Sequence, residues 1–240
     1  MWRVLNVLRR IFPQSFPKFE ALVRLGLLRC EIGLVWPMRN LNRPRNFALH
    51  EPNWDYLRLS NLELAAHEIY QNGIAGNVAE LGVFHGDFSS KINEAFPDRT
   101  LYLFDTFTGF DARDILVEDE KKIATPDKTF PGAITAKVMK RMKHKDKIVL
   151  CDGFFPETAN GLEEEIFAFV SLDVDLYKPT LEGLHFFYPR LSKGGYIFVH
   201  DFHSRHFPGC GQAVREFIHE TKATYIPVTD QGGSVVICAA

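Results

Sequence analysis

The sequence alternates between short apolar runs and helical patterns over residues 55–240. Five of the apolar runs have the length and side-chain composition of strands; they occupy residues 77–83, 100–105, 147–151, 166–173 and 196–200. Two further β-rich runs, 224–229 and 234–238, flank a Gly-containing turn, which is typical of a hairpin. Alternating strands and helices build a parallel sheet with helices on both faces. The pattern therefore predicts an α/β, doubly wound sheet of seven strands, mostly parallel, with one antiparallel strand near its edge.

The beginning of the chain departs from this pattern. Prolines interrupt its short helical patches at several points, so we expect residues 1–54 to form a helical and loop extension and residues 55–240 to form the main domain. Residues 1–12 carry an amphipathic stripe with arginines around it, which is compatible with contact to a membrane surface. Such stripes more often pack on their own domain or on a second subunit. We therefore favour packing, including a homo-oligomer contact, over membrane contact.

The bulk composition restricts the class of protein. A net charge of −2 over 240 residues gives no reason to expect a nucleic-acid partner. The four cysteines are far apart and form no CxxC pair, which favours reduced thiols in a cytoplasmic protein over a disulfide framework. No apolar run approaches the ~20 residues that a membrane span requires.

A turn with two glycines follows the first predicted strand. In the stretch VAELGVFHGDFSSK, the strand ends at Glu80 and the turn contains Gly82 and Gly86. Ser89 and Ser90 lie at the start of the next helix, where free N–H groups are available to a ligand. The turn does not have the GxGxxG spacing, so it lacks the full cradle for a pyrophosphate. This spacing and the charge of Glu80 favour a nucleoside ligand without phosphates, and a cationic one.

Later strands also end on acidic residues. In an open parallel sheet, the carboxyl ends of the strands line one crevice, where ligands bind. Asp105 ends the second strand about 20 residues after the glycine turn, a position that typically binds ribose hydroxyls; the alternative is a turn aspartate. We assign Thr106, which follows it, to the same site. Asp152, Gly153 and Phe154 end the third strand and suit an adenine amine and ring face, although Asp-Gly is also a common turn.

Two further strands supply the second half of the predicted site. Asp173 ends the fourth strand, and His200 with Asp201 ends the fifth. Carboxylate oxygens suit Mg²⁺, whereas His200 is a better ligand for Zn²⁺ or Fe²⁺. Side chains alternate along a strand, so only one of Asp173 and Asp175 should face a given crevice unless the chain has already turned. The alternative is that these acids only cap the following helices. His203 is a candidate general base, because imidazole titrates near neutrality.

One long segment has no recognisable period. Residues 111–131 are polar and irregular, which predicts a lid or a binding loop rather than a regular element. Residues 133–143 have a helical period and many basic side chains, which we interpret as a solvated helix face.

Four stretches resemble the class I S-adenosylmethionine-dependent methyltransferases, and more narrowly the macrocin O-methyltransferase (TylF-type) family. They are VAELGVFHGDFSS, LYLFDTFTGF, LDVDLYKPTLEGLHFFYPRLSKGGYIFVHD and GCGQAV. The resemblance covers roughly residues 55–240. It implies a Rossmann-like fold and a metal-assisted O-methyltransferase that acts on a sugar hydroxyl, with S-adenosylmethionine and Mg²⁺ as cofactors.

The resemblance also implies roles for the candidate residues. Asp105 would bind the ribose, Asp152 and Phe154 would lie near adenine, and Asp173, His200 and Asp201 match the metal-binding positions. Members of the family usually carry two adjacent acids where this chain has His200-Asp201. A bound Mg²⁺ would acidify the acceptor hydroxyl, and Asp173 or a nearby histidine such as His203 would take its proton. The residues around the methionine moiety would be Glu80, Gly82, Gly86, Ser89 and Ser90.

Other classes of protein remain open at this point. The same carboxylates suit a metal-dependent hydrolase or oxygenase. The fold also suits a nucleoside-binding protein without catalysis, and a Rossmann oxidoreductase is weakened by the incomplete phosphate turn. The sequence itself does not identify the acceptor. The resemblance implies a sugar hydroxyl on a glycosylated small molecule or on a surface polysaccharide.

Overall fold

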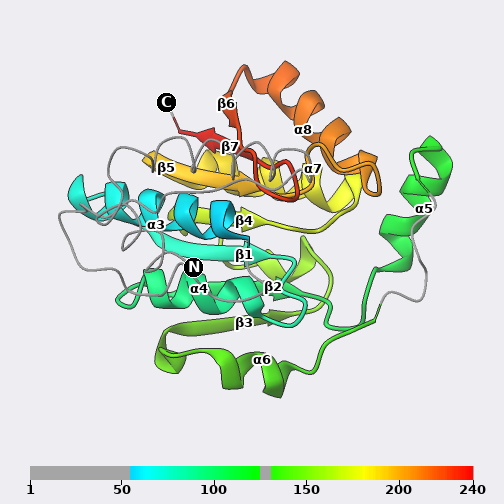
Figure 1. The fold of residues 1–240 in the computed structure, drawn as a ribbon. Helices are drawn as coiled ribbons and strands as arrows, with labels where there is room; N and C mark the ends of the chain where they lie inside the picture. The colour runs from blue at the N-terminus through cyan, green and yellow to red at the C-terminus, as the bar shows by residue number, and fades with distance from the viewer. Residues whose placement is uncertain (1–54, 125–130, 240) are drawn as a thin grey trace, which may run out of the picture. The chain divides into compact units, whose positions relative to one another are not determined.

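A single sheet organises the computed structural model, which describes residues 55–124 and 131–239. The expectations for residues 1–54 therefore lie outside the described part of the chain. The sheet has seven strands in the order β3-β2-β1-β4-β5-β7-β6 (Figure 1). Strand β7 runs antiparallel to both β5 and β6, and the other strand pairs of this sheet are parallel, which confirms the predicted sheet. The strands are β1 (Asn77–Leu81), β2 (Leu101–Asp105), β3 (Ile148–Asp152), β4 (Phe167–Leu172), β5 (Leu191–Val199), β6 (Thr224–Pro227) and β7 (Val235–Cys238).

Helices pack on both faces of this sheet. Successive side chains of a strand point to opposite faces, so Val78 of β1 contributes to one apolar core and Ala79 and Leu81 to the other. The first core includes side chains of α3 (Tyr56–Gln71), α4 (Asp87–Ala95) and α6 (Thr135–Arg141). The second includes side chains of α7 (Tyr177–Phe187) and α8 (Pro208–Thr221). Short 3₁₀ turns occupy Lys145–Lys147, Glu157–Ala159 and Tyr188–Arg190.

The prediction that residues 111–131 lack regular structure is wrong for half of that segment. Residues Ala112–Lys121 form helix α5, and the side chain of Asp111 accepts the N–H of Arg113 at its start. The buried residues of α5 are Asp114, Ile115 and Glu118. Because two of these three are acidic, the helix has no apolar stripe for a periodicity argument to detect.

The fifth strand begins earlier than predicted. It starts at Leu191 rather than at residue 196, and it includes Gly194 and Gly195. The pairing of β4 with β5 shifts register between Phe167 and Phe169, which accommodates the additional residues. None of the helices in residues 55–124 and 131–239 combines the length and apolar character needed to cross a bilayer.

Candidate active site

A cavity of about 290 Å³ opens at the carboxyl ends of β1, β2 and β4. Parallel strands direct these ends to one edge of the sheet, so residues distant in sequence meet there. Its lining contains several acidic side chains but also Arg58 of α3. Such a lining favours a cationic ligand over a phosphate. The acidic residues at its lining are Glu80, Asp87, Asp105, Asp111, Asp114, Asp173 and Asp175.

The glycine turn brings the end of β1 against the end of β4. Gly82 has a φ of 91°, and a Cβ at this position would overlap the carbonyl group of Asp173. Gly86, with a φ of 76°, is the N-cap of α4. Both glycines are therefore required by backbone conformation, and Gly82 is also required by its close approach to Asp173. Gly82 lines the cavity.

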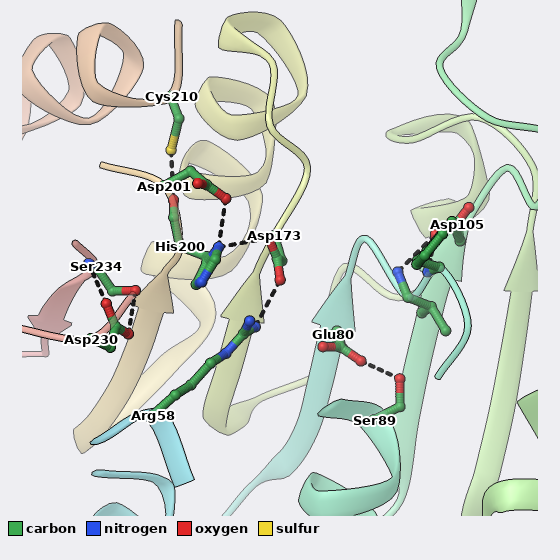
Figure 2. Close-up of polar contacts among 12 residues, drawn as sticks. Arg58, Glu80, Ser89, Asp105, Asp173, His200, Asp201, Cys210, Asp230 and Ser234 are labelled. Carbon is green, nitrogen blue, oxygen red and sulfur yellow. Dashed lines mark hydrogen bonds and ion pairs between the residues drawn. The ribbon is translucent and has the colours of Figure 1, made fainter. Parts of the chain in front are cut away.

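Asp105 organises the backbone around the turn. Its Oδ2 accepts the N–H groups of Val83 and Phe84 at 2.7 and 2.8 Å, and its Oδ1 accepts the N–H of Phe107 at 2.7 Å. Figure 2 shows the Asp105 carboxylate turned toward this backbone. The predicted alternative of a turn aspartate thus describes contacts that Asp105 makes, while its position at the cavity keeps it available to a ligand.

Glu80 lies at the base of the cavity and is almost completely buried. The hydroxyl of Ser89 donates a hydrogen bond to it (Figure 2). Burial raises the pKa of Glu80 to about 8, against the opposing effects of the Ser89 hydrogen bond and the Arg58 charge. A positive charge in the cavity would therefore favour the ionised form of Glu80.

Three of the predicted residues form a compact group at the ends of β4 and β5. Nδ1 of His200 lies 3.2 Å from Oδ1 of Asp173 and 2.5 Å from Oδ2 of Asp201 (Figure 2). One potential ligand atom from each residue lies within 4.8 Å of the other two. Two carboxylates and an imidazole at these distances fit a divalent cation that accepts oxygen and nitrogen ligands. Of the three side chains, only that of Asp173 lines the cavity.

Arg58 joins this group from α3. Its Nη2 donates to Oδ2 of Asp173 at 2.8 Å, and its guanidinium lies 3.9 Å from the centre of the Phe88 ring. Burial alone would raise the pKa of Asp173, but the charges and hydrogen bonds of Arg58 and His200 hold it well below its ordinary value. Burial alone would lower the pKa of His200, but its hydrogen bonds to Asp173 and Asp201 raise it to about 10.

Sequence reasoning missed both Arg58 and the contribution of Asp175. The chain turns directly after β4: Asp175 adopts a φ of 64° and lines the same cavity as Asp173. Its pKa is raised to about 9 by burial and by the negative charges of Asp173 and Asp201. Side chains stop alternating between faces once the chain has turned out of the strand, so Asp173 and Asp175 can both face the cavity. Arg58 is 115 positions from Asp173, and nothing in the local sequence indicates their contact.

The other predicted residues are distributed between the cavity and the surrounding structure. Thr106, Gly153 and Phe154 line the cavity. The hydroxyl of Ser90 instead donates to the carbonyl of Asp87, and Ser89 is directed to Glu80 and not to the cavity lining. Asp152 and His203 are both exposed and lie outside the lining.

Helix α5 contributes to the lining of the same cavity. Its first turn contributes Asp114 to the lining, and Nζ of Lys178 in α7 lies 3.3 Å from Oδ1 of Asp114. The Arg113 guanidinium lies 3.4 Å from the centre of the Phe154 ring, which places it over one face of that ring. Glu118 accepts the backbone N–H of Tyr177 at the beginning of α7. The segment predicted as a loop thus contacts both Phe154, which follows β3, and α7.

Comparison with known proteins assigns the chain to a family. The model of the macrocin O-methyltransferase (TylF) family matches residues 55–233. Mycinamicin III 3''-O-methyltransferase of Micromonospora griseorubida is 29% identical over 175 residues, which are 67% of each chain. Demethyldecarbamoylnovobiocin O-methyltransferase of Streptomyces niveus is 25% identical over 171 residues, which are 67% of this chain and 64% of that one. The chain therefore spans about two thirds of the length of these relatives.

Solved structures show the same fold. The O-methyltransferase NovP superposes with a TM-score of 0.65 at 24% identity, over 77% of this chain and 80% of that chain. The calicheamicin methyltransferase CalS11 superposes with a TM-score of 0.61 at 19% identity, over 76% of this chain and 81% of that chain. The family match extends over most of the domain that contains the cavity and the Asp173 group, and the chain belongs to the macrocin O-methyltransferase (TylF) family.

Proposed function

We propose that the protein is an S-adenosylmethionine-dependent O-methyltransferase that methylates a sugar hydroxyl with the help of a divalent metal ion. The observation that carries this proposal is the position of Asp173. Its carboxylate belongs to the group with His200 and Asp201, and it also lines the cavity formed by the glycine turn and Asp105. One residue thus connects a place for the methyl donor with a place for the acceptor oxygen.

The cofactor half of the proposal assigns the methyl donor to the acid-lined cavity. S-adenosylmethionine carries a positive sulfonium, which an acidic lining attracts. Glu80, Gly82 and Gly86 would lie around its methionine moiety, and Asp105 would accept hydrogen bonds from its ribose. Since Ser89 and Ser90 are engaged elsewhere, their proposed role is to support the turn.

The adenine end of the cofactor is assigned to the residues after β2 and β3. Thr106, Gly153 and Phe154 line this part of the cavity. Arg113 covers one face of the Phe154 ring, so the proposed contact with adenine uses the remaining surface of that ring. Asp152 is exposed, and it would reach the adenine amine only from the rim of the cavity.

The acceptor half of the proposal assigns the metal to Asp173, His200 and Asp201. The donor set fits Mg²⁺ through its carboxylates and Mn²⁺, Fe²⁺ or Zn²⁺ through its imidazole. When bound there, a divalent cation would lower the pKa of an acceptor hydroxyl. This acidification matters because Asp173, held strongly in its ionised form by Arg58 and His200, is a weak base on its own.

The chain's residues would then hold the two reactants in line. A lone pair of the acceptor oxygen forms a bond to the methyl carbon while the carbon–sulfur bond breaks, so that S-adenosylhomocysteine leaves as a neutral thioether. The hydroxyl proton passes to the carboxylate of Asp173. His203 is exposed and outside the cavity lining, which favours Asp173 over His203 as the proton acceptor.

The acceptor class is inferred from the relatives. One is named a mycinamicin III 3''-O-methyltransferase, and another, from Streptomyces olivaceus and 26% identical, is named for the 4'-O-methylation of a rhamnosyl tetracenomycin. A hydroxyl of a sugar, on a glycosylated small molecule or on a polysaccharide, is therefore the proposed acceptor.

Calorimetric titration with S-adenosylhomocysteine, with and without Mg²⁺, tests the cofactor half. Micromolar affinity is expected in both conditions. An acceptor screen with radiolabelled S-adenosylmethionine and glycosylated substrates, before and after treatment with a chelator, then tests the metal. No binding of S-adenosylhomocysteine in either condition would overturn the proposal and favour a metal-dependent hydrolase or oxygenase. Binding without methyl transfer to any sugar would favour a non-catalytic nucleoside-binding protein.

A further inference from the structure

The imidazole of His200 is confined on two opposite edges. On one edge, Nδ1 faces the carboxylates of Asp173 and Asp201. On the other edge lies Gly232, in the turn between β6 and β7. A Cβ at Gly232 would lie under 3.0 Å from Nε2, Cε1 and Cδ2 of the ring. The backbone of this turn therefore packs against the His200 side chain with no room for a methyl group.

The need for glycine at position 232 comes from the ring and not from the backbone. The φ of Gly232 is outside the left-handed region, so other residues can adopt its conformation. The adjacent Gly233 is the reverse case. Its φ is 58°, and a Cβ there would meet the Cβ of His203 and not the ring of His200. Substitution of Gly232 therefore tests the contact with the His200 ring, whereas substitution of Gly233 tests backbone strain in the same turn.

The turn is fixed by hydrogen bonds on several sides. The backbone N–H and the hydroxyl of Ser234 donate to the carboxylate of Asp230 at 2.8 and 2.6 Å (Figure 2). The N–H of Gln231 donates to Oδ2 of Asp55, which is the N-cap of α3, at 2.6 Å. Because α3 also carries Arg58, the turn and the Asp173 contact are anchored to one helix.

We propose that Gly232 is a positioning residue for the metal centre. The turn Asp230–Gly233 holds the far edge of the imidazole, so that Nδ1, and not Nε2, is presented beside the carboxylates of Asp173 and Asp201. Gly232 touches neither substrate nor metal and acts through His200. The inference rests on the metal-binding role proposed for His200, and it assigns the tautomer and the ring nitrogen through which this side chain would bind the ion.

Metal affinity of the full chain provides the first test. Manganese binding, followed by electron paramagnetic resonance and calorimetry, is compared between the unmodified protein, Gly232→Ala and Gly233→Ala. Residues that orient metal ligands typically change affinity by about 10- to 100-fold when replaced, so Gly232→Ala is expected to weaken Mn²⁺ binding at least about 10-fold. Gly233→Ala, the variant with the greater backbone strain, is expected to stay within about 3-fold. Equal losses in the two variants would overturn the inference.

A double variant distinguishes positioning from general damage to the turn. An aspartate at position 200 is shorter than histidine and does not extend to Gly232. Gly232→Ala should therefore cause no further loss of Mn²⁺ affinity in a His200→Asp background. The same loss in both backgrounds would show that Gly232 acts through the fold alone. Binding of S-adenosylhomocysteine, which depends on the other half of the site, should be unchanged in every variant.

Nuclear magnetic resonance gives a readout that needs no metal. The inference requires a nuclear Overhauser effect between the His200 ring protons and the α-protons of Gly232, and a shift of the ring signals in Gly232→Ala but not in Gly233→Ala. If the unmodified protein fails to bind Mn²⁺, the metal part of the proposed function is wrong, and these ring signals still decide the inference. If the unmodified protein does bind metal, Zn²⁺ titration with ¹⁵N detection should identify Nδ1 as the perturbed nitrogen; perturbation of Nε2 would contradict the inference.

Discussion

The two halves of the candidate site are held together by different kinds of contact. On the β1–β2 side, Asp105 bonds to backbone N–H groups that are 2 to 22 positions away in the chain. On the β4–β5 side, side chains bond to one another, and Arg58 and Asp173 are 115 positions apart. The first half is therefore organised largely by local sequence, whereas the second depends on the complete fold. Substitutions in the two halves should accordingly affect different measurable quantities.

Asp173→Ala is expected to separate turnover from affinity for S-adenosylhomocysteine more strongly than any other variant proposed below. The variant loses the carboxylate that contacts Arg58 and His200, so turnover should fall by more than roughly 1,000-fold. Affinity for S-adenosylhomocysteine should change by less than about 3-fold, because Asp105 and the glycine turn are intact. Steady-state kinetics and calorimetry measure the two quantities. Normal turnover would show that Asp173 serves neither the metal nor the proton transfer.

Asp105→Ala should produce the opposite pattern. It removes the proposed ribose ligand and the acceptor of three backbone N–H groups, so the dissociation constant for S-adenosylhomocysteine should rise about 100-fold. Asp152 is the matched control, since it pairs with Asp105 in the β2–β3 register but is exposed. Asp152→Ala should change the dissociation constant by less than about 3-fold. A similar effect of both variants would contradict the assignment of the ribose to Asp105.

This difference between the halves also explains how much the sequence could predict. The positions of the strands along the chain, the glycine turn and the position of Asp105 follow from apolar runs and from residues close together in the chain. The meeting of Asp173, His200 and Asp201 was predictable as well, because the carboxyl ends of parallel strands share one edge of a sheet. Glycine requirements imposed by neighbours, such as Gly82 against the carbonyl of Asp173, become visible only when the two strands are placed side by side.

The features that the sequence did not predict involve buried charged side chains, which a hydrophobic pattern assigns to the solvent-exposed surface. Helix α5 buries the carboxylates of Asp114 and Glu118, which a hydrophobic periodicity assigns to solvent. Arg58 is a charged side chain between two leucines of α3, where only the tertiary contact with Asp173 reveals its role. In both cases an acid or a base is compensated by a residue from another element, and single-sequence reasoning has no access to that pairing.

Arg58→Lys tests whether the pairing with Asp173 contributes to the reaction. Lysine keeps the positive charge but lacks the planar guanidinium that lies over Phe88 and donates to Asp173. Turnover should fall about 10-fold while affinity for S-adenosylhomocysteine changes little.

Arg113→Ala is the counterpart in the cofactor half, because Arg113 covers the Phe154 ring. It should weaken S-adenosylhomocysteine binding about 3-fold, by the loss of a cation–π contact, and leave saturated turnover unchanged. Equal effects of both variants on turnover would remove the distinction between the halves.

The smallest expected effect concerns stability and involves α5, which contacts Phe154 of the cofactor half and helix α7. Burial raises the pKa of Asp114 from its ordinary value to about 6, because the attraction of Lys178 compensates only part of the burial. A carboxyl group with a raised pKa in the folded state costs nothing below its unfolded pKa, and the cost grows as the pH rises through the folded pKa. Asp114→Asn removes a cost of at most about 3 kcal/mol above pH ~6, but it also leaves Lys178 with Glu182 as its remaining acidic contact, at 3.9 Å. We therefore expect a net gain of about 1 kcal/mol in the free energy of unfolding at about pH 8, and a smaller gain at about pH 5.

Urea denaturation of both proteins at the two pH values measures this gain. Asp119→Asn is the control for the loss of one negative charge from α5, because Asp119 is an exposed acid on the same helix. A gain for Asp114→Asn that is larger at the lower pH would reverse the sign and show that Asp114 is stabilised as a carboxylate by Lys178. In that case α5 would be held to α7 by an ion pair, an electrostatic contact like that of Arg58 with Asp173. The predicted sign instead makes α5 an element whose acidic residue is buried at a cost to stability, which is the expected signature of a side chain retained for a ligand in the cavity that it lines.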